Sequence, residues 1–165
     1  MAEIAEMAGV AIGTIYRYFE TKNVLITELY QELENKIMKV LHDGYLLGTP
    51  VQKRFFYIIR ELLRYFITHP THFRYMEQYC NSPYGLSVHR DRLLGKLGTH
   101  NNILMGIFDE GIEQQILKEL PKPVLCSLAF GPMIHLMRDH ILGFIILDEV
   151  LIKHITEACW DAIKR

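Results

Sequence analysis

The chain has 165 residues, of which 50% are hydrophobic and 22% are charged, so it can bury a substantial core and is not a disordered protein. Its formal net charge of −1 excludes the strongly basic composition that is typical of many nucleic-acid-binding proteins. The longest apolar run, Ile141 to Leu147, has seven residues against the ~20 of a membrane span, so no membrane partner is expected.

The first predicted feature is a pair of short helices joined by a tight turn at Gly9. Glycine suits this turn because it has no Cβ and adopts the left-handed conformation without steric cost. Several small or apolar residues recur at the spacing of one helical turn, so we expect them to pack in the angle between the helices. These residues are Ile4, Ala5, Ala8, Val10 and Ile15. The pattern predicts a helix-turn-helix.

The outer face of the second helix is the face that such a pair inserts into the DNA major groove. The hydroxyl groups of Thr14 and Tyr16 can reach phosphate oxygens, and Arg17 can contact a phosphate or a guanine edge. A simple helical corner in a core is the alternative, but it has no need of exposed aromatic and basic residues. The predicted DNA-binding residues are Ile12, Gly13, Thr14, Tyr16, Arg17, Tyr18 and Lys22.

The run from Ile4 to Lys22 closely resembles the DNA-binding domain of the TetR family of bacterial transcriptional regulators, whose hallmark has the form IAxxAGVxxGTxYxxFxxK. The resemblance implies an all-α fold, a palindromic operator bound by a homodimer, and repression that a small-molecule effector releases. It also implies a further helix before the point at which this sequence begins. Ala11 departs from the family, which commonly has Ser or Thr there, and the lost cap costs about 1 kcal/mol.

Helical periodicity continues along the rest of the chain, without the alternation of strands. Thr21 is a suitable N-cap for a long helix that ends near Asp43. Five more helices are predicted, over about Val51 to Thr68, Thr71 to Cys80, Ser87 to Gly111, Pro121 to Gly143, and Asp148 to Ile163. By the resemblance, residues 1–44 form the DNA-binding domain with its connecting helix, and residues 45–165 form the effector-binding and dimerisation domain.

The resemblance places an effector pocket among the helices of the second domain. Tyrosine and methionine side chains there predict a mainly apolar or aromatic ligand, and buried arginines would need an anionic group on that ligand. Two alternatives stay open, since the aromatic residues can be core and the arginines can face solvent or pair with Glu61, Glu77 and Asp139. The predicted effector-binding residues are Tyr57, Arg60, Arg64, Tyr65, Tyr79, His100, Asn101, Leu104, Phe108, Phe130, Met133 and Met137.

The last two predicted helices carry more apolar positions than one inward stripe requires. A helix that is apolar beyond a single stripe is buried on more than one side. Pairing both helices with their copies across a two-fold axis forms a four-helix bundle, as in TetR-like proteins. The predicted dimerisation residues are Leu128, Met137, Ile141, Leu151, Ile155, Ala158, Cys159 and Ala162.

No pattern predicts catalysis, a cofactor or a metal: nucleophile elbow, phosphate loop, carboxylate pair and metal-ligand spacing are all missing from the sequence. Widely spaced cysteines and a charged N-terminus without a signal peptide predict a cytoplasmic protein with reduced thiols. A ligand-responsive regulator is the first hypothesis. The alternative is a helical small-molecule-binding protein whose DNA-reading motif is no longer active. The first 44 residues hold four Lys or Arg against seven Asp or Glu, which slightly favours the alternative.

Overall fold

The computed structural model describes residues 1–86, 90 and 102–165, and it is built from α-helices, as predicted. Each helix coincides with a segment of helical periodicity in the sequence. In chain order they are α1 (Ala2–Met7), α2 (Ile12–Tyr18), α3 (Lys22–Asp43), α4 (Val51–Thr68), α5 (Pro70–Cys80), α7 (Asn102–Glu113), α8 (Lys122–Ile141) and α9 (Glu149–Ile163).

The ends of the helices follow local chemistry that the sequence displays. The Thr21 hydroxyl accepts a hydrogen bond from the Val24 N–H at 3.2 Å, and the Asp148 carboxylate caps α9 through the Leu151 N–H at 2.8 Å. Helix α8 ends at Ile141, two residues before the predicted Gly143, because Gly143 adopts a φ of +80° that ends the helical path. Helix α7 runs two residues past Gly111, and the predicted start of its segment at Ser87 lies outside the described residues.

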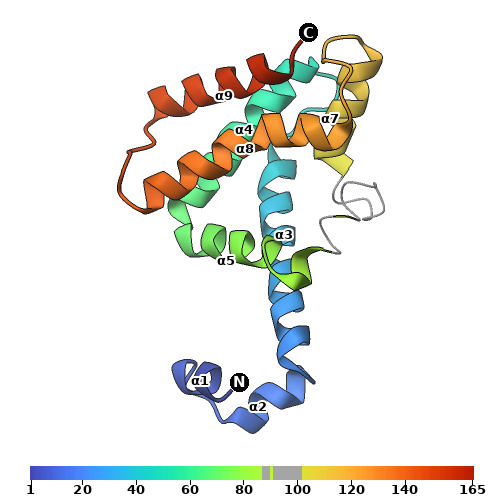
Figure 1. Cartoon of the computed structure of the whole chain (residues 1–165). Coiled ribbons are helices and arrows are strands. Elements are labelled where there is room, and N and C mark those ends of the chain that lie inside the picture. Colours follow the sequence, from blue (N-terminus) through green and yellow to red (C-terminus); the bar gives the residue numbers. More distant parts are fainter. Residues whose placement is uncertain (87–89, 91–101) are drawn as a thin grey trace.

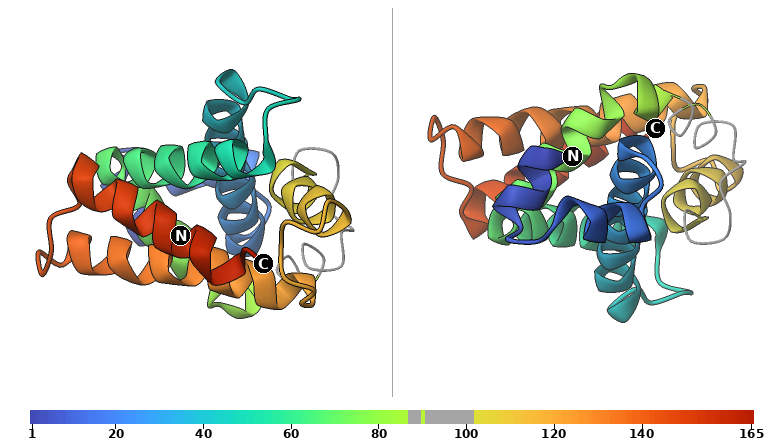
Figure 2. Two further views of the ribbon diagram at one scale, coloured as in Figure 1. Left: turned by 90° about the horizontal axis from the view of Figure 1, so that it is seen from above. Right: turned by 90° about the horizontal axis from the view of Figure 1, so that it is seen from below.

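The helices form two regions joined by α3 (Figure 1). Helices α1 and α2, the N-terminal unit (residues 1–21), lie at one end of α3, and helices α4, α5, α7, α8 and α9, the body, lie along the rest of it. Seen from above, α9 crosses over α4 and α8, with α7 at one end of this group (Figure 2). Among the helices described, none is both long enough and apolar enough to cross a membrane.

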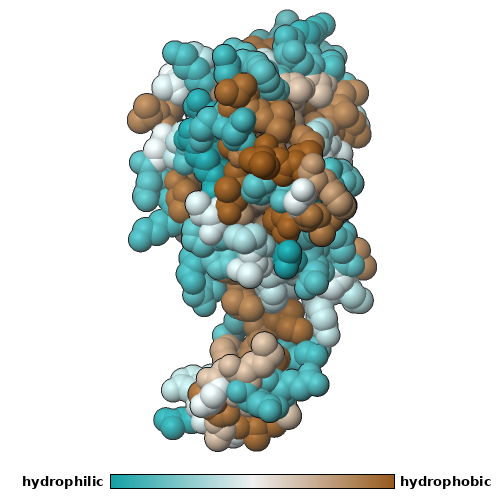
Figure 3. Space-filling model, turned by 90° about the vertical axis from the view of Figure 1, so that its left-hand side faces the viewer, coloured by the Kyte–Doolittle hydropathy of each residue, from teal (hydrophilic) through white to brown (hydrophobic). Residues whose placement is uncertain are grey.

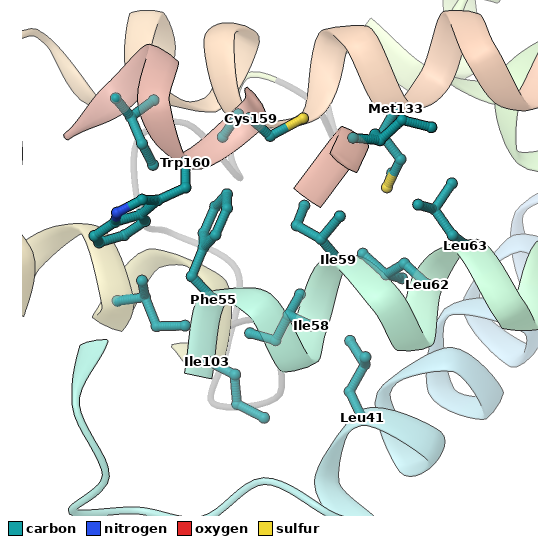
Figure 4. Close-up of a cluster of buried hydrophobic side chains, with 14 of the residues drawn as sticks. Leu41, Phe55, Ile58, Ile59, Leu62, Leu63, Ile103, Met133, Cys159 and Trp160 are labelled. Atoms are coloured by element: carbon teal, nitrogen blue, oxygen red, sulfur yellow. The ribbon is translucent and has the colours of Figure 1, made fainter. Parts of the chain in front are cut away.

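The core of the body forms where α4 packs against α8 and α9 (Figure 4). Phe55, Ile59 and Leu63 recur on α4 at four-residue intervals, so all three point to the same side. They meet Met133 of α8 and Trp160 of α9, and all five side chains are buried. Full burial of an apolar side chain of this size contributes about 1.5–3 kcal/mol, so this cluster supplies much of the stability.

Helix α5 attaches the body to the N-terminal half of α3. The Tyr75 hydroxyl donates a hydrogen bond to the Ile26 carbonyl at 2.6 Å, and the Tyr30 and Tyr79 rings stack with centroids 4.0 Å apart. Ile26 lies in the second turn of α3, close to the N-terminal unit. Helix α5 is therefore joined to the part of α3 that lies next to α1 and α2.

Candidate functional site

The N-terminal unit is a helix-turn-helix with a very small core. Ala5 of α1 and Ile15 of α2 are buried against each other's helices, and Gly9 turns the chain with a φ of +66°, as predicted. The expectation that Ala8 and Val10 face the interior is wrong, since both are exposed. The Val10 N–H donates a hydrogen bond back to the Ala5 carbonyl at 3.0 Å, which closes the turn. The side chains of Ala8 and Val10, on either side of Gly9, therefore point to solvent.

Helix α2 presents most of its circumference to solvent. The exposed fractions are 44% for Ile12, 49% for Tyr16 and 70% for Tyr18, while Ile15 alone is buried. Gly13, Thr14 and Arg17 are exposed as well, so the structure brings six of the seven predicted DNA-binding residues onto this one short helix. Its N-cap residue, Ala11, makes no side-chain cap, which agrees with the departure noted in the sequence.

Two cations lie free on this surface. Lys22, the seventh predicted DNA-binding residue, is exposed at the first position of α3. The Arg17 guanidinium lies 6.0 Å from the centre of the Tyr18 ring. Neither Arg17 nor Lys22 forms an ion pair with any residue that the structure describes. Both charges can therefore meet phosphate groups without first breaking an ion pair.

No steric or backbone constraint within the described structure requires a glycine at position 13, in the first turn of α2. A Cβ placed on it would have no atom within 4 Å, and its backbone is helical rather than left-handed. At Gly111, by contrast, a Cβ would come within 2.6 Å of Leu117 Cδ1, so packing requires that glycine. Glycine inside a helix costs about 0.5–1 kcal/mol relative to alanine. The sequence pattern places Gly13 on the outer face of α2, and the structure adds that no packing contact of the fold requires a glycine there.

The predicted effector-binding residues do not converge on one cavity. One group fills the interior between α7, α8 and α4, where its members pack on the core: Leu104, Phe108, Phe130, Met133 and Met137. Tyr57 and Tyr65 also pack against this core, but each of the three tyrosines has a different hydrogen-bond or ring partner. Tyr57 donates to the Val40 carbonyl, Tyr65 bonds to His72, and Tyr79 stacks on Tyr30. His100 and Asn101 lie outside the described residues.

Two arginines, Arg60 and Arg64, were predicted to line this pocket, with solvent exposure or pairing to acidic residues as the alternative, and the structure shows the alternative. Arg60 and Arg64 are exposed on the outer side of α4. Arg64 makes a bidentate pair with Glu149, with N–O distances of 2.7 and 3.0 Å, and also pairs with Glu61 at 2.9 Å. The guanidinium holds the pKa of Glu149 below its usual value. These acidic partners satisfy Arg64, so it needs no anionic ligand.

A hollow of about 230 Å³ opens elsewhere, between the α4–α5 corner and the end of α8. The sequence does not predict this hollow, because its two sides come from segments about 70 residues apart and helical periodicity carries no information about which helices meet. We call it the α5–α8 groove. Its lining residues are Ile67, Pro70, Thr71, Arg74, His140 and Ile141.

The predicted dimerisation residues divide between the core and the surface. Met137, Ile155 and Cys159 are buried by their own chain, so their assignment to an interface is wrong. Burial raises the pKa of the Cys159 thiol to about 11. Leu128 and Ala158 are exposed, while the remaining three are partly buried: Ile141, Leu151 and Ala162.

An apolar surface that sequence analysis missed lies beside these exposed positions. Apolar side chains gather on the face of the body that carries the α8–α9 connection (Figure 3). Phe144 and Ile146 in that connection are 76% and 81% exposed. Other large exposed apolar residues on these two helices and their connection are Val124, Ile134, Leu142 and Val150. Exposed clusters of this kind mark sites of protein association.

Comparison with known proteins matches both regions. A model of the family described as "Tetracyclin repressor-like, C-terminal domain" matches residues 50–164, and the model of "Bacterial regulatory proteins, tetR family" matches residues 1–29. Together these models include most of the chain. No curated protein matches it.

Solved structures of TetR-family regulators share the fold. A regulator from Marinobacter aquaeolei VT8 is 22% identical, with a TM-score of 0.83 over 98% of this chain and 82% of its own. One from Vibrio parahaemolyticus is 26% identical, with a TM-score of 0.74 over 99% of this chain and 86% of its own. One from Haemophilus influenzae Rd is 21% identical, with a TM-score of 0.80 over 99% of this chain and 84% of its own.

Proposed function

Because the chain belongs to the TetR family of bacterial regulatory proteins, we propose that it binds a palindromic DNA operator as a homodimer and represses transcription until a small molecule releases it. The outer face of α2 enters the major groove. Tyr16 and Thr14 donate hydroxyl hydrogen bonds to phosphates, Arg17 contacts a phosphate or a guanine edge, and Ile12 contacts a thymine methyl group.

The observation that carries the proposal is the position of Gly13 on the exposed face of α2. Gly106 and Gly131 also lie in helices with no atom within 4 Å of a Cβ, but both are only partly exposed and lie in the body. Gly13 instead lies on the face of α2 that carries Arg17. On the exposed face of α2, a missing side chain lets the DNA backbone approach the helix closely. Arg17, one turn further along α2, and Lys22, at the start of α3, form no ion pair among the described residues and supply the attraction for that approach.

A homodimer provides the second copy of α2 that a palindromic operator requires. Two half-sites are read when two such helices lie one DNA turn apart, about 34 Å. The outer stripe of α8 and α9 with their connection is the interface that we propose, in place of the buried residues first expected. It comprises Val124, Leu128, Phe144, Ile146, Val150 and Ala158.

A second candidate keeps the body's ligand binding but not the DNA binding. The acidic balance of residues 1–44 and the uncapped start of α2 at Ala11 favour it. In that case the exposed face of α2 would have no partner.

A selection of duplexes from a random DNA pool separates the two candidates. The proposed regulator should enrich a two-fold symmetric sequence and bind it with an affinity that falls steeply with salt. Lys22→Ala should weaken specific and nonspecific DNA alike and reduce the salt slope by about 1. Arg60→Ala, on the outer side of α4, is the matched control and should change neither. If no sequence is enriched and no duplex is bound at low salt, the regulator proposal is wrong.

A further inference from the structure

The α5–α8 groove combines apolar walls with polar groups at one side. Ile67, Pro70 and Ile141 provide hydrocarbon surface, and Thr71, Arg74 and His140 provide hydrogen-bonding groups. Its volume of about 230 Å³ is slightly below the range of pockets for drug-sized ligands, ~300–1,000 Å³. The groove is therefore suited to a small molecule with one polar end.

Arg74 differs from the other arginines that join elements of the body. Arg54 pairs with Glu110, Arg64 with Glu61 and Glu149, and Arg138 with Glu77. Arg74 makes no ion pair or hydrogen bond among the described residues, although its side chain lines the groove. An arginine without a carboxylate partner is a ready site for an anion, because its planar fork matches carboxylate geometry.

His140 lines the same groove from the end of α8. Its Nδ1 lies 3.3 Å from both the Leu147 backbone nitrogen and the Ile145 carbonyl oxygen, so both contacts of this ring nitrogen are made with the α8–α9 connection. Nε2 has no hydrogen-bond partner among the described residues, and it donates whenever it carries the ring hydrogen. Arg74 and His140 thus offer polar groups from opposite walls, and none of the described residues that line the groove is acidic.

We propose that the α5–α8 groove binds a small organic carboxylate with a short apolar or aromatic body, and that this molecule is the effector. The carboxylate would lie against Arg74 and His140, and its apolar body against Ile67, Pro70 and Ile141. Inorganic phosphate can pair with Arg74 but has no apolar part to contact Ile67, Pro70 and Ile141. The proposal that the groove binds a carboxylate depends only on these contacts. The proposal that this carboxylate is the effector also depends on the proposed DNA-binding function.

Helix α5 provides the connection from the groove to the DNA-binding unit. Its first turns contribute Thr71 and Arg74 to the groove, while Tyr75 holds the Ile26 carbonyl of α3. A ligand that draws α5 toward His140 of α8 would therefore shift α3 and the α2 helix that it carries. Such a shift changes DNA affinity only if the ligand binds the two arrangements unequally.

Calorimetric titration of the full chain with benzoate and hexanoate tests the binding site. Benzamide is the neutral counterpart of benzoate, and inorganic phosphate is the anion without an apolar body. We expect saturable binding of at least one carboxylate, and about tenfold weaker binding of benzamide and phosphate. Arg74→Gln should reduce carboxylate affinity by about tenfold, whereas Arg60→Gln, an exposed arginine of α4 that lies outside the groove, should leave it unchanged.

Three results would overturn the assignment: no saturable carboxylate binding at millimolar concentration, equal binding of benzamide, or unchanged affinity in Arg74→Gln. The effector role is tested separately on the selected DNA. The bound carboxylate should lower DNA affinity in the wild type and not in Arg74→Gln, and an unchanged DNA affinity would overturn that role. Failure of the wild type to bind any DNA would instead count against the proposed function, because the titrations are made without DNA.

Discussion

The N-terminal unit and the body use their apolar side chains in opposite ways. Helices α1 and α2 bury one residue each, Ala5 and Ile15, and leave large side chains such as Ile12 and Tyr16 in solvent. In the body, α4 alone buries eight residues against its neighbours. Stability is thus concentrated in the body, and the N-terminal unit leaves an apolar and aromatic surface exposed.

Helix α3 changes character where it passes from one region to the other. Its first residues are exposed or half-buried, and burial begins at Tyr30, where the Tyr79 ring stacks on it. From there Leu33, Ile37 and Leu41 continue the buried row at helical spacing. The buried half of α3 therefore belongs to the body, and the other half extends from it to the N-terminal unit.

The largest expected effect is a loss of folding when a charge is placed at a buried position of α9, in contrast to an exposed position of the same helix. Ile155→Asp places a carboxylate in the core, where an unpaired charge costs several kcal/mol, so this variant should fail to fold. Ala158→Asp, three residues further on and exposed, should fold but remain monomeric if the proposed interface is right. Circular dichroism and sedimentation measure both properties. A folded Ile155→Asp protein would contradict the core assignment, and a dimeric Ala158→Asp protein would contradict the interface.

Substitutions on the outer face of α2 should lower DNA affinity without lowering the stability of the fold. Replacing Tyr16 or Arg17 by Ala is expected to cost about 1–3 kcal/mol of affinity for the selected DNA. The same changes should alter the free energy of unfolding by no more than about 0.5 kcal/mol, since both side chains are exposed. Fluorescence anisotropy and urea titration provide the two values. Unchanged DNA affinity in both variants would remove this face from the interface.

A smaller effect is expected at the α4–α5 corner, where the body meets α3. Burial, then His69 and Lys36, lower the pKa of His72, whose Nδ1 lies 2.9 Å from the Tyr65 hydroxyl. The folded state therefore favours the neutral ring, so its contribution to stability is complete above the ordinary value of 6.5 and is lost as the pH falls below it.

The urea midpoint should accordingly fall between about pH 7.5 and about pH 5.5, and His72→Gln should flatten that fall. Glutamine keeps an acceptor for the Tyr65 hydroxyl without a titrating group. His154→Gln, at an exposed position of α9, is the control and should keep the wild-type slope. Equal slopes in the wild type and His72→Gln would contradict the assignment.

Sequence patterns predicted the features that depend on local chemistry. The limits of α4 follow from Pro50 and Pro70 on either side of an amphipathic run, and Gly9 identifies the turn between α1 and α2. The exposed face of α2 followed from the same pattern. These features are determined by neighbours within a few positions, which a sequence displays directly.

Features that depend on tertiary contacts were not accessible in the same way. On a helix that is apolar on several sides, periodicity does not tell which stripe faces the chain's own core, so Ile155 and Ala158 were assigned to one face. For Arg64 a ligand and a pair with Glu61 were both open; the Glu61 pair forms, and the second partner, Glu149, lies 85 positions away, where sequence patterns give no signal. The α5–α8 groove was missed for the same reason, because Arg74 and His140 meet only after folding.

The direct test of the central claim, that α2 is shaped for DNA rather than for the fold, is Gly13→Ala. The free energy of unfolding should rise by about 0.5–1 kcal/mol, because alanine favours the helix and a Cβ meets no atom within 4 Å. Affinity for the selected DNA should fall by about tenfold or more, ~1.4 kcal/mol. Gly106→Ala in α7, where a Cβ is equally unobstructed, should stabilise the fold and leave DNA affinity unchanged. A Gly13→Ala protein that binds the selected DNA as tightly as the wild type would contradict the account.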